Sequence, residues 1–182
     1  MRVVAGKYKG FNLKAPQGKD TRPTDNKVKE AIFDMLYPIN HVGIVLDLFA
    51  GSGQMGIEFL SREVKLVYFN EINRTSYKIL EENLAKIEDE NVKLSKLDYK
   101  KALESYKNKG IKFDYIFLDP PYEGEFLIDS IDLIMDYELL NEDGIVITES
   151  DDDIKFDGKY DLYLLKEKSY GRKLVNIYIK WK

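Results

Sequence analysis

The chain has 182 residues, of which 44% are hydrophobic and 33% charged, which is typical of one globular domain with its own core. It contains no Cys and a single His, His41, which excludes disulfides, thiolate catalysis and a Cys/His zinc site, and we expect no bound metal. The formal net charge of -4 argues against a uniformly basic nucleic-acid binder.

The charge is distributed unevenly along the chain. Residues 1–29 contain eight basic and two acidic side chains, a charge of +6, so the remainder has 20 basic and 30 acidic ones, a charge of -10. A basic segment on an acidic body suggests that a polyanion docks on one side, although a solvated Lys-rich surface explains the same count. No apolar run approaches the length of a membrane span and no signal-peptide pattern is present, so we expect a cytoplasmic protein.

The first predicted elements lie within residues 1–38. Loose alternation predicts a small hairpin or irregular β element at 1–14, followed by a loop. A helix capped by Thr24 or Asp25 follows and ends before Pro38. Its predicted apolar face comprises Val28, Ala31, Ile32, Met35 and Leu36. We expect 1–38 to form a basic extension of the part at 39–182, within a single compact unit.

From residue 44 onward, short apolar runs alternate with amphipathic stretches. Strands are predicted at 44–49, 65–71, 91–98, 113–122 and 144–150. Helices are predicted at 53–62, 73–87, 99–108 and 126–140. Two last apolar runs, 160–168 and 173–181, have no helix between them, which predicts a hairpin turning at 169–172. The order predicts an α/β fold with a mostly parallel, doubly wound, seven-stranded sheet that ends in an antiparallel strand pair.

A glycine loop with the sequence GSGQMG, at 51–56, follows the first buried strand and opens a helix. Its glycines allow a tight turn and the close approach of a ligand to backbone N–H groups. Glu71 lies 20 residues after Gly51, at the end of the next strand, where a carboxylate can accept both hydroxyls of a ribose. Because NAD-binding proteins carry the same pattern, the loop by itself does not identify the ligand.

Two further carboxylates bear on that choice. Asp47 is an acid in an otherwise apolar strand, and its burial is costly unless a partner satisfies it. The α-ammonium group of S-adenosylmethionine is such a partner, whereas a pyrophosphate would be repelled. Asp98 ends the third predicted strand at the same edge of the sheet. It either accepts a hydrogen bond from an adenine amino group or merely caps the helix that begins at Tyr99.

The tetrapeptide Asp119-Pro120-Pro121-Tyr122 follows the fourth predicted strand. Its prolines fix the backbone and free the Pro120 carbonyl from the sheet ladder. That carbonyl and the Asp119 carboxylate can accept the two hydrogens of an exocyclic amino group, while Tyr122 offers a face to a flipped-out base. Such a site suits direct displacement at a sulfonium methyl, which needs alignment more than a strong base. The alternative is a stiff turn with a surface tyrosine.

Together these motifs resemble the class I S-adenosylmethionine-dependent amino-methyltransferases, and more narrowly the RsmD family of bacterial small-subunit rRNA guanine-N2 methyltransferases. The resemblance covers nearly the whole chain, and the N-terminal signature discriminates best because the other motifs occur in many methyltransferases. The matching segments are 1–10, 22–24, 28–30 with Phe33, 47–53, 56–58, 60–62, 119–122 and 170–171. The departures are Gln54-Met55 in the loop, Asn70 before Glu71, and Arg172.

The resemblance implies a Rossmann-like class I methyltransferase fold, S-adenosylmethionine as cofactor, and methylation of the 2-amino group of guanine(966) in 16S rRNA. We expect a monomer that acts on rRNA within a small-subunit ribosomal particle. The implied cofactor site comprises Asp47, Phe49, Gly51, Ser52, Gly53, Gly56, Glu71, Ile72, Asp98 and Tyr99. The implied catalytic residues are Asp119, Pro120, Pro121 and Tyr122. The residues expected to bind RNA are Arg2, Lys7, Lys9, Lys14, Arg22, Thr24 and Lys27.

Three other functions would use parts of the same residue pattern. An adenine-N6 or other amino-methyltransferase acting on DNA or protein would use the same chemistry, although 182 residues leave little room for a DNA-recognition domain. An NAD-dependent dehydrogenase is disfavoured by Asp47 and by the lack of a catalytic His or Tyr/Lys pair. A non-catalytic RNA-binding module is disfavoured by the complete set of site residues. Cofactor affinity separates methyltransferases from dehydrogenases, and turnover separates an enzyme from a binding module.

Overall fold

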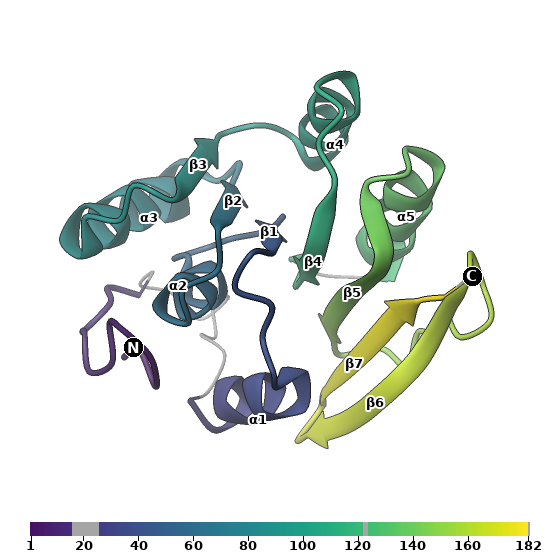
Figure 1. The fold of residues 1–182 in the computed structure, drawn as a ribbon, viewed down its shortest axis with the longest axis horizontal. Coiled ribbons are helices and arrows are strands. Elements are labelled where there is room, and N and C mark those ends of the chain that lie inside the picture. Colours follow the sequence, from purple (N-terminus) through teal and green to yellow (C-terminus); the bar gives the residue numbers. More distant parts are fainter. Residues whose placement is uncertain (16–25, 122–123, 182) are drawn as a thin grey trace.

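The computed structural model describes residues 1–15, 26–121 and 124–181. At its centre is a seven-stranded sheet in the order β3-β2-β1-β4-β5-β7-β6 (Figure 1). The strands are β1 (Ile44–Asp47), β2 (Leu66–Asn70), β3 (Val92–Ser95), β4 (Phe113–Leu118), β5 (Leu140–Ser150), β6 (Leu162–Tyr170) and β7 (Lys173–Lys180). β7 is antiparallel to both of its neighbours, and the other pairs are parallel. The predicted α/β fold, with its antiparallel final pair, is confirmed.

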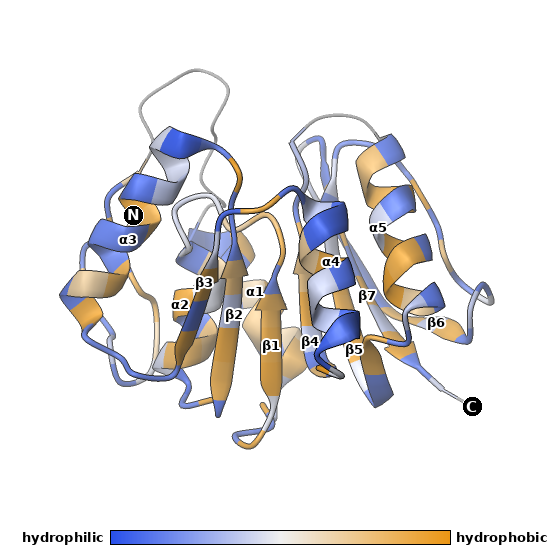
Figure 2. Ribbon diagram, turned by 90° about the horizontal axis from the view of Figure 1, so that it is seen from above, coloured by the Kyte–Doolittle hydropathy of each residue, from blue (hydrophilic) through white to orange (hydrophobic). Residues whose placement is uncertain are grey.

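Helices cover both faces of this sheet. On one face lie α1 (Asn26–Leu36), α2 (Gln54–Ser61) and α3 (Arg74–Ile87), and on the other lie α4 (Tyr99–Asn108) and α5 (Gly124–Asp136) (Figure 1). Successive strand residues point to opposite faces, so Val45 joins the apolar cluster beneath α1 to α3 while Leu46 joins the one beneath α4 and α5. The central strands are therefore apolar along most of their length (Figure 2).

The predicted helix at 126–140 is wrong at its C-terminal end. α5 stops at Asp136, and Glu138 adopts a left-handed φ of 51°. The Leu139 N–H donates to the Ile134 carbonyl (3.0 Å), which is the longer hydrogen bond of a Schellman cap. Because Glu138 occupies a position where glycine is usual, the sequence carries no stop signal there. β5 then begins earlier than the predicted 144–150.

Two strands also end earlier than predicted. β3 and β4 end before the predicted 91–98 and 113–122 do, because the residues beyond them leave the ladder to form the loops at this edge of the sheet. The turn predicted at 169–172 is confirmed, since Tyr170 pairs with Lys173 across the hairpin and Gly171 has a φ of 63°.

The inner face of α1 also differs from the prediction. Ala31 and Met35 are half-buried, whereas Lys29 and Phe33 are buried. The Lys29 Nζ lies 3.1 Å from Glu58 Oε1 on α2, and both side chains are fully enclosed. Because Lys29 is buried in this ion pair, it is not among the basic side chains of residues 1–29 that can contact a polyanion.

The N-terminal segment, residues 1–15, packs against α2 and α3. Arg2 and Asn12 form an antiparallel bridge, which confirms the small hairpin. The Val4 N–H donates to the same buried Glu58 (2.8 Å), and the segment contributes apolar side chains to the cluster beneath α1 to α3. The division of the chain at residue 38 stays a prediction.

One glycine of this segment lies against α2 with no space for a side chain. Gly6 has a φ of +81°, and a Cβ there would lie 1.8 Å from the Ser61 carbonyl oxygen. We expect Gly6→Ala to lower the free energy of unfolding by about 3 kcal/mol, because left-handed strain and a backbone overlap combine. Gly10 is the matched control, since its φ is +90° and a Cβ there meets nothing within 4 Å. Equal losses for Gly6→Ala and Gly10→Ala in urea denaturation would contradict the overlap.

Candidate active site

Four carboxylates gather where the parallel strands end. Asp47 is the last residue of β1, Glu71 and Asp119 directly follow β2 and β4, and Glu149 lies near the end of β5. The first three were predicted as site residues. Glu149 was missed, although its signal is the same as that of Asp47, an acid at the end of an apolar strand.

Asp47 is buried, with 1% of its surface exposed. Its Oδ2 accepts a hydrogen bond from the Gly56 N–H on α2 (2.9 Å). Burial and the nearby Glu71 carboxylate raise the pKa of Asp47 to about 7, against the lowering effect of that hydrogen bond. A cationic group placed beside Asp47 would therefore be favoured, because it stabilises the ionised carboxylate.

The glycine loop turns tightly between β1 and α2. Gly51 and Gly53 have φ of +56° and +81°, and a Cβ on Gly53 would lie 2.3 Å from Leu80 Cδ1. A Cβ on Gly51 would meet nothing within 4 Å, so the space beside that residue is open. The Gly51 N–H donates to Glu71 Oε2 (2.7 Å), which holds the carboxylate at the border of this space. The open cradle and the carboxylate fit the ribose and amino-acid part of S-adenosylmethionine.

The remaining predicted cofactor residues lie around this loop. The rings of Phe49 and Tyr99 are 5.6 Å apart, and the Ile72 side chain after β2 is exposed. Asp98 Oδ1 accepts the Lys100 N–H (3.0 Å), so its role as the cap of α4 is confirmed. Its contact with an adenine amino group stays a prediction. Ser52 is buried in the loop, and its carbonyl accepts a hydrogen bond from a side chain of α3.

Asn70 holds three strand ends together, a role that the sequence reasoning did not assign. Its amide nitrogen donates to the carbonyls of Leu48 (3.3 Å) and Leu97 (3.0 Å). Its Oδ1 accepts from the hydroxyl of Ser95 (2.8 Å). The available signal was a polar residue at the end of an apolar strand, directly before Glu71. These bonds fix the loops after β1 and β3 relative to Glu71.

Asp119 lies on the far side of Asp47 from Glu71, since β4 pairs with β1 on the side opposite β2. One third (33%) of its side chain is exposed, and its Oδ2 is 4.0 Å from Lys173 Nζ. Burial and the Glu149 carboxylate raise the pKa of Asp119, and the Lys173 ammonium opposes them. Of the residues that follow, Pro120 is half-buried and Pro121 exposed, and Tyr122 lies outside the described residues.

The residues predicted to bind RNA are partly engaged within the protein. Lys7 pairs with Asp89 (3.5 Å) and Lys14 with Glu82, although all four of the described N-terminal cations are exposed. These cations are Arg2, Lys7, Lys9 and Lys14. Lys27 is exposed at the start of α1, and Arg22 and Thr24 lie outside the described residues.

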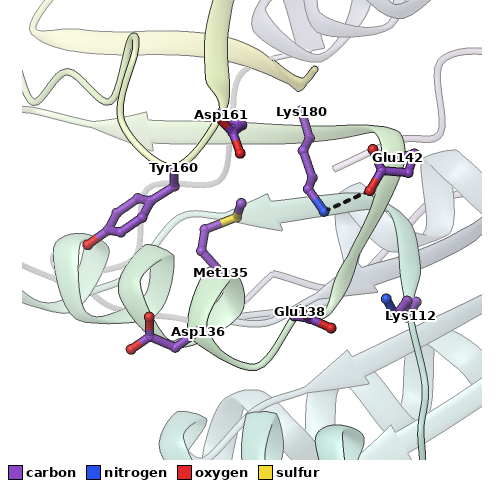
Figure 3. A pocket seen from close by; sticks show the side chains of 8 residues that line it. All are labelled: Lys112, Met135, Asp136, Glu138, Glu142, Tyr160, Asp161 and Lys180. Atoms are coloured by element: carbon purple, nitrogen blue, oxygen red, sulfur yellow. Dashed lines mark hydrogen bonds and ion pairs between the residues drawn. The ribbon is translucent and has the colours of Figure 1, made fainter. Parts of the chain in front are cut away.

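A depression lies at the opposite, amino edge of the sheet (Figure 3). Acidic side chains from the end of α5 and the start of β5 line it, and its Lys180 lies 3.4 Å from Glu142. It holds none of the predicted site residues. In the described ranges, no three His, Cys, Asp or Glu side chains are arranged to hold a metal ion. Every helix in those ranges is too short or too polar to cross a membrane.

Known proteins resemble this chain over nearly its whole length. Residues 1–179 match the family described as Conserved hypothetical protein 95. The chain belongs to this family. It is 38% identical over 182 residues to YlbH of Bacillus subtilis, with 99% of each chain covered. It is 33% identical over 176 residues to ribosomal RNA small subunit methyltransferase D of Haemophilus influenzae, with 94% of this chain and 89% of the relative covered.

A solved structure agrees with this membership. The structure of yhhF from Escherichia coli has a TM-score of 0.86 with this chain at 26% identity, and covers 100% of this chain and 98% of its own. The likeness extends over the N-terminal segment as well as the sheet. The RsmD-like membership and the class I methyltransferase fold expected from the sequence are both confirmed.

Proposed function

We propose that this protein transfers a methyl group from S-adenosylmethionine to the exocyclic 2-amino group of a guanine in 16S rRNA, guanine(966) or its equivalent. The observation that carries the proposal is the placement of Asp119 and its prolines beside the buried Asp47 and the open glycine cradle. The relatives that carry the name ribosomal RNA small subunit methyltransferase D support the proposed reaction further. We further propose a cytoplasmic monomer whose substrate is a small-subunit particle.

The carboxylates at the strand ends suit a cationic cofactor. Asp47 would bind the α-ammonium group and Glu71 the ribose hydroxyls, while the N–H groups of the glycine loop face the amino-acid part. The adenine would lie among Phe49, Ile72 and Tyr99, with Asp98 accepting from its amino group. When bound, S-adenosylmethionine supplies a methyl group on a sulfonium, which is an electrophile activated without any metal.

The Asp119 turn would hold the target amino group. The Asp119 carboxylate and the Pro120 carbonyl accept its two hydrogens, which directs the nitrogen lone pair away from them and towards the methyl carbon. Tyr122 would stack on the flipped base. The methyl group would pass from sulfur to this nitrogen, leaving the cofactor as a neutral thioether, and Asp119 or water would take the proton that the nitrogen releases. Alignment and negative charge near the amino group provide the catalysis.

The exposed N-terminal cations would contact RNA phosphates. Since Lys7 and Lys14 already have acidic partners, Arg2 and Lys9 are proposed as the stronger phosphate contacts. Their segment packs on α2, which directly follows the glycine loop, so the backbone that carries these cations is placed close to that loop. Affinity for RNA should therefore fall with salt concentration.

The test is methyl transfer from labelled S-adenosylmethionine to rRNA that lacks the modification. Small ribosomal subunits and naked small-subunit rRNA are offered separately, and the labelled nucleoside is identified after digestion. We expect N2-methylguanosine, with subunits as the better substrate. N6-methyladenosine would support the adenine alternative instead. If the protein binds the cofactor but transfers no labelled methyl group to either RNA, the assignment of rRNA as the substrate is wrong.

A further inference from the structure

Lys173 lies in the site although it comes from the far end of the chain. It is the first residue of β7, directly after the hairpin turn, and its Nζ forms an ion pair with Glu149 of β5. The same Nζ is 4.0 Å from Asp119 Oδ2. Only 27% of the Lys173 side chain is exposed, and that of Glu149 is fully enclosed.

The topology explains this arrangement. β4, β5 and β7 are neighbours in the sheet, and β7 alone of these runs antiparallel. The beginning of β7 therefore lies at the edge where β4 and β5 end. The Lys173 side chain points to the α1–α3 face, two and four residues before Val175 and Ile177 of that face's apolar cluster. A parallel final strand would have placed its first residue at the opposite edge.

The charges around Asp119 are mostly negative. Glu149 acts from β5, Asp47 from β1 and Asp151 from the residues after β5, and all three favour the protonated form of Asp119. Lys173 opposes them from β7. Burial is the largest single influence on the pKa of Lys173 and lowers it, but the Asp119 and Glu149 carboxylates together outweigh it. The pKa is therefore raised and Lys173 stays charged.

The protonation state of Asp119 decides what it can do. An ionised carboxylate accepts hydrogen bonds at both oxygens, whereas a protonated one carries a donor that would oppose the hydrogens of an amino group. Asp119 can thus grip the target amino group only when ionised. A nearby cation that is itself fixed by a buried partner increases the fraction of Asp119 in that state, against the burial and the negative neighbours that oppose it.

We infer that Lys173 is a positioning residue for the reaction: held by the buried Glu149, its ammonium group lies beside the Asp119 carboxylate and favours the ionised form that accepts from the target amino group. The inference rests on the proposed function, because it gives Asp119 the role described above. Lys173 and Glu149 act through Asp119 and need not touch the substrate. Their opposite charges predict opposite effects on the reaction.

The experiment measures the pH dependence of methyl transfer at saturating cofactor. In the wild type, the rate should fall at low pH as Asp119 gains a proton. In Lys173→Met, the midpoint of this fall should lie about one pH unit higher than in the wild type. At pH values below both midpoints, the variant should therefore be about tenfold slower than the wild type. Glu149→Gln removes a negative neighbour and should move the fall to lower pH. Lys173→Arg keeps the charge and should leave the fall in place.

Controls separate this electrostatic role from a structural one. Lys173→Met removes the cation that faces the buried Glu149. The double variant Lys173→Met/Glu149→Gln removes both charges and should return the fall towards its wild-type pH. Calorimetric titration with S-adenosylmethionine tests whether each variant is folded and binds the cofactor. Asp119→Asn should abolish the fall, which assigns it to Asp119.

The outcomes separate a failure of the proposed function from a failure of the role given to Lys173. If the wild type transfers no methyl group to rRNA, the proposed function fails. If the wild type is active but Lys173→Met and Glu149→Gln shift the pH profile in the same direction, or not at all, the inference about Lys173 is overturned and the proposed function stands. Opposite shifts would support the inference.

Discussion

Replacing Asp119 with alanine should lower the rate of methyl transfer at saturating cofactor by at least about a hundredfold. The variant loses the carboxylate that accepts from the target amino group, while the glycine loop and Asp47 are untouched. Cofactor affinity, measured by calorimetry, should therefore stay close to the wild-type value. Asp119→Asn retains one acceptor oxygen without the charge and should have an intermediate rate.

A matched control lies on α5. Asp132 is also a carboxylate with a lysine partner, Lys159 at 3.3 Å, but its other partner is the hydroxyl of Tyr160, which lines the depression at the opposite edge of the sheet. Asp132→Ala should leave the rate unchanged. Near-normal turnover of Asp119→Ala, or an equal loss in Asp132→Ala, would show that the catalytic assignment of Asp119 is wrong.

Replacing Asp47 with asparagine should weaken the binding of S-adenosylmethionine at least about tenfold, a loss of about 1.4 kcal/mol. Asparagine keeps an oxygen that can accept the Gly56 N–H, so the loop is preserved and the charge is what changes. The wild type should bind more tightly as pH rises towards 7 and Asp47 ionises. This pH dependence should be absent from Asp47→Asn.

The same substitution should stabilise the protein without cofactor. Asp47 has an ordinary pKa of 3.8 and one of about 7 in the folded protein, so between these values the folded state holds a proton that the unfolded state has lost. The stability of the wild type therefore falls as pH rises through this window and stays reduced above it. Asp47→Asn avoids this loss, and its melting temperature should exceed that of the wild type most clearly above pH 7.

These two effects have opposite signs, which makes the result specific. A variant that was merely misfolded would lose both stability and affinity. If Asp47→Asn binds cofactor as tightly as the wild type, the ammonium-binding role of Asp47 is wrong. If it instead melts at a lower temperature above pH 7, the burial cost assigned to the carboxylate is wrong.

The order and type of most helices and strands could be predicted from the sequence. The apolar strands have both faces covered, so they appear as short continuous runs between helices of clear periodicity. Asp47, Glu71 and Asp119 stood out because each is an acid at the end of such a run, and parallel strands bring their carboxyl ends to one edge. Local chemistry and topology agree at these positions, and so the prediction succeeded.

Predictions from local sequence patterns were wrong where a residue has a conformation or a burial that is unusual for its type. Glu138 adopts the left-handed conformation that ends α5, and a Glu in the sequence gives no sign of this. Lys29 appeared to be one of several solvent-exposed cations, yet it is buried because Glu58 of α2 lies opposite it. Its partner comes from a different helix, so spacing along α1 alone could not predict the burial.

By itself, the sequence determined the fold class, the glycine loop and the acids at the strand ends, because these depend on periodicity and on residues close together in the chain. Only the tertiary structure decided which charges meet. Lys173 lies on β7, Glu149 on β5, and Asp119 directly after β4. They come together because β7 runs antiparallel beside β5. Electrostatic energy depends on distance in space and on burial, which the order of residues does not specify until the sheet has formed.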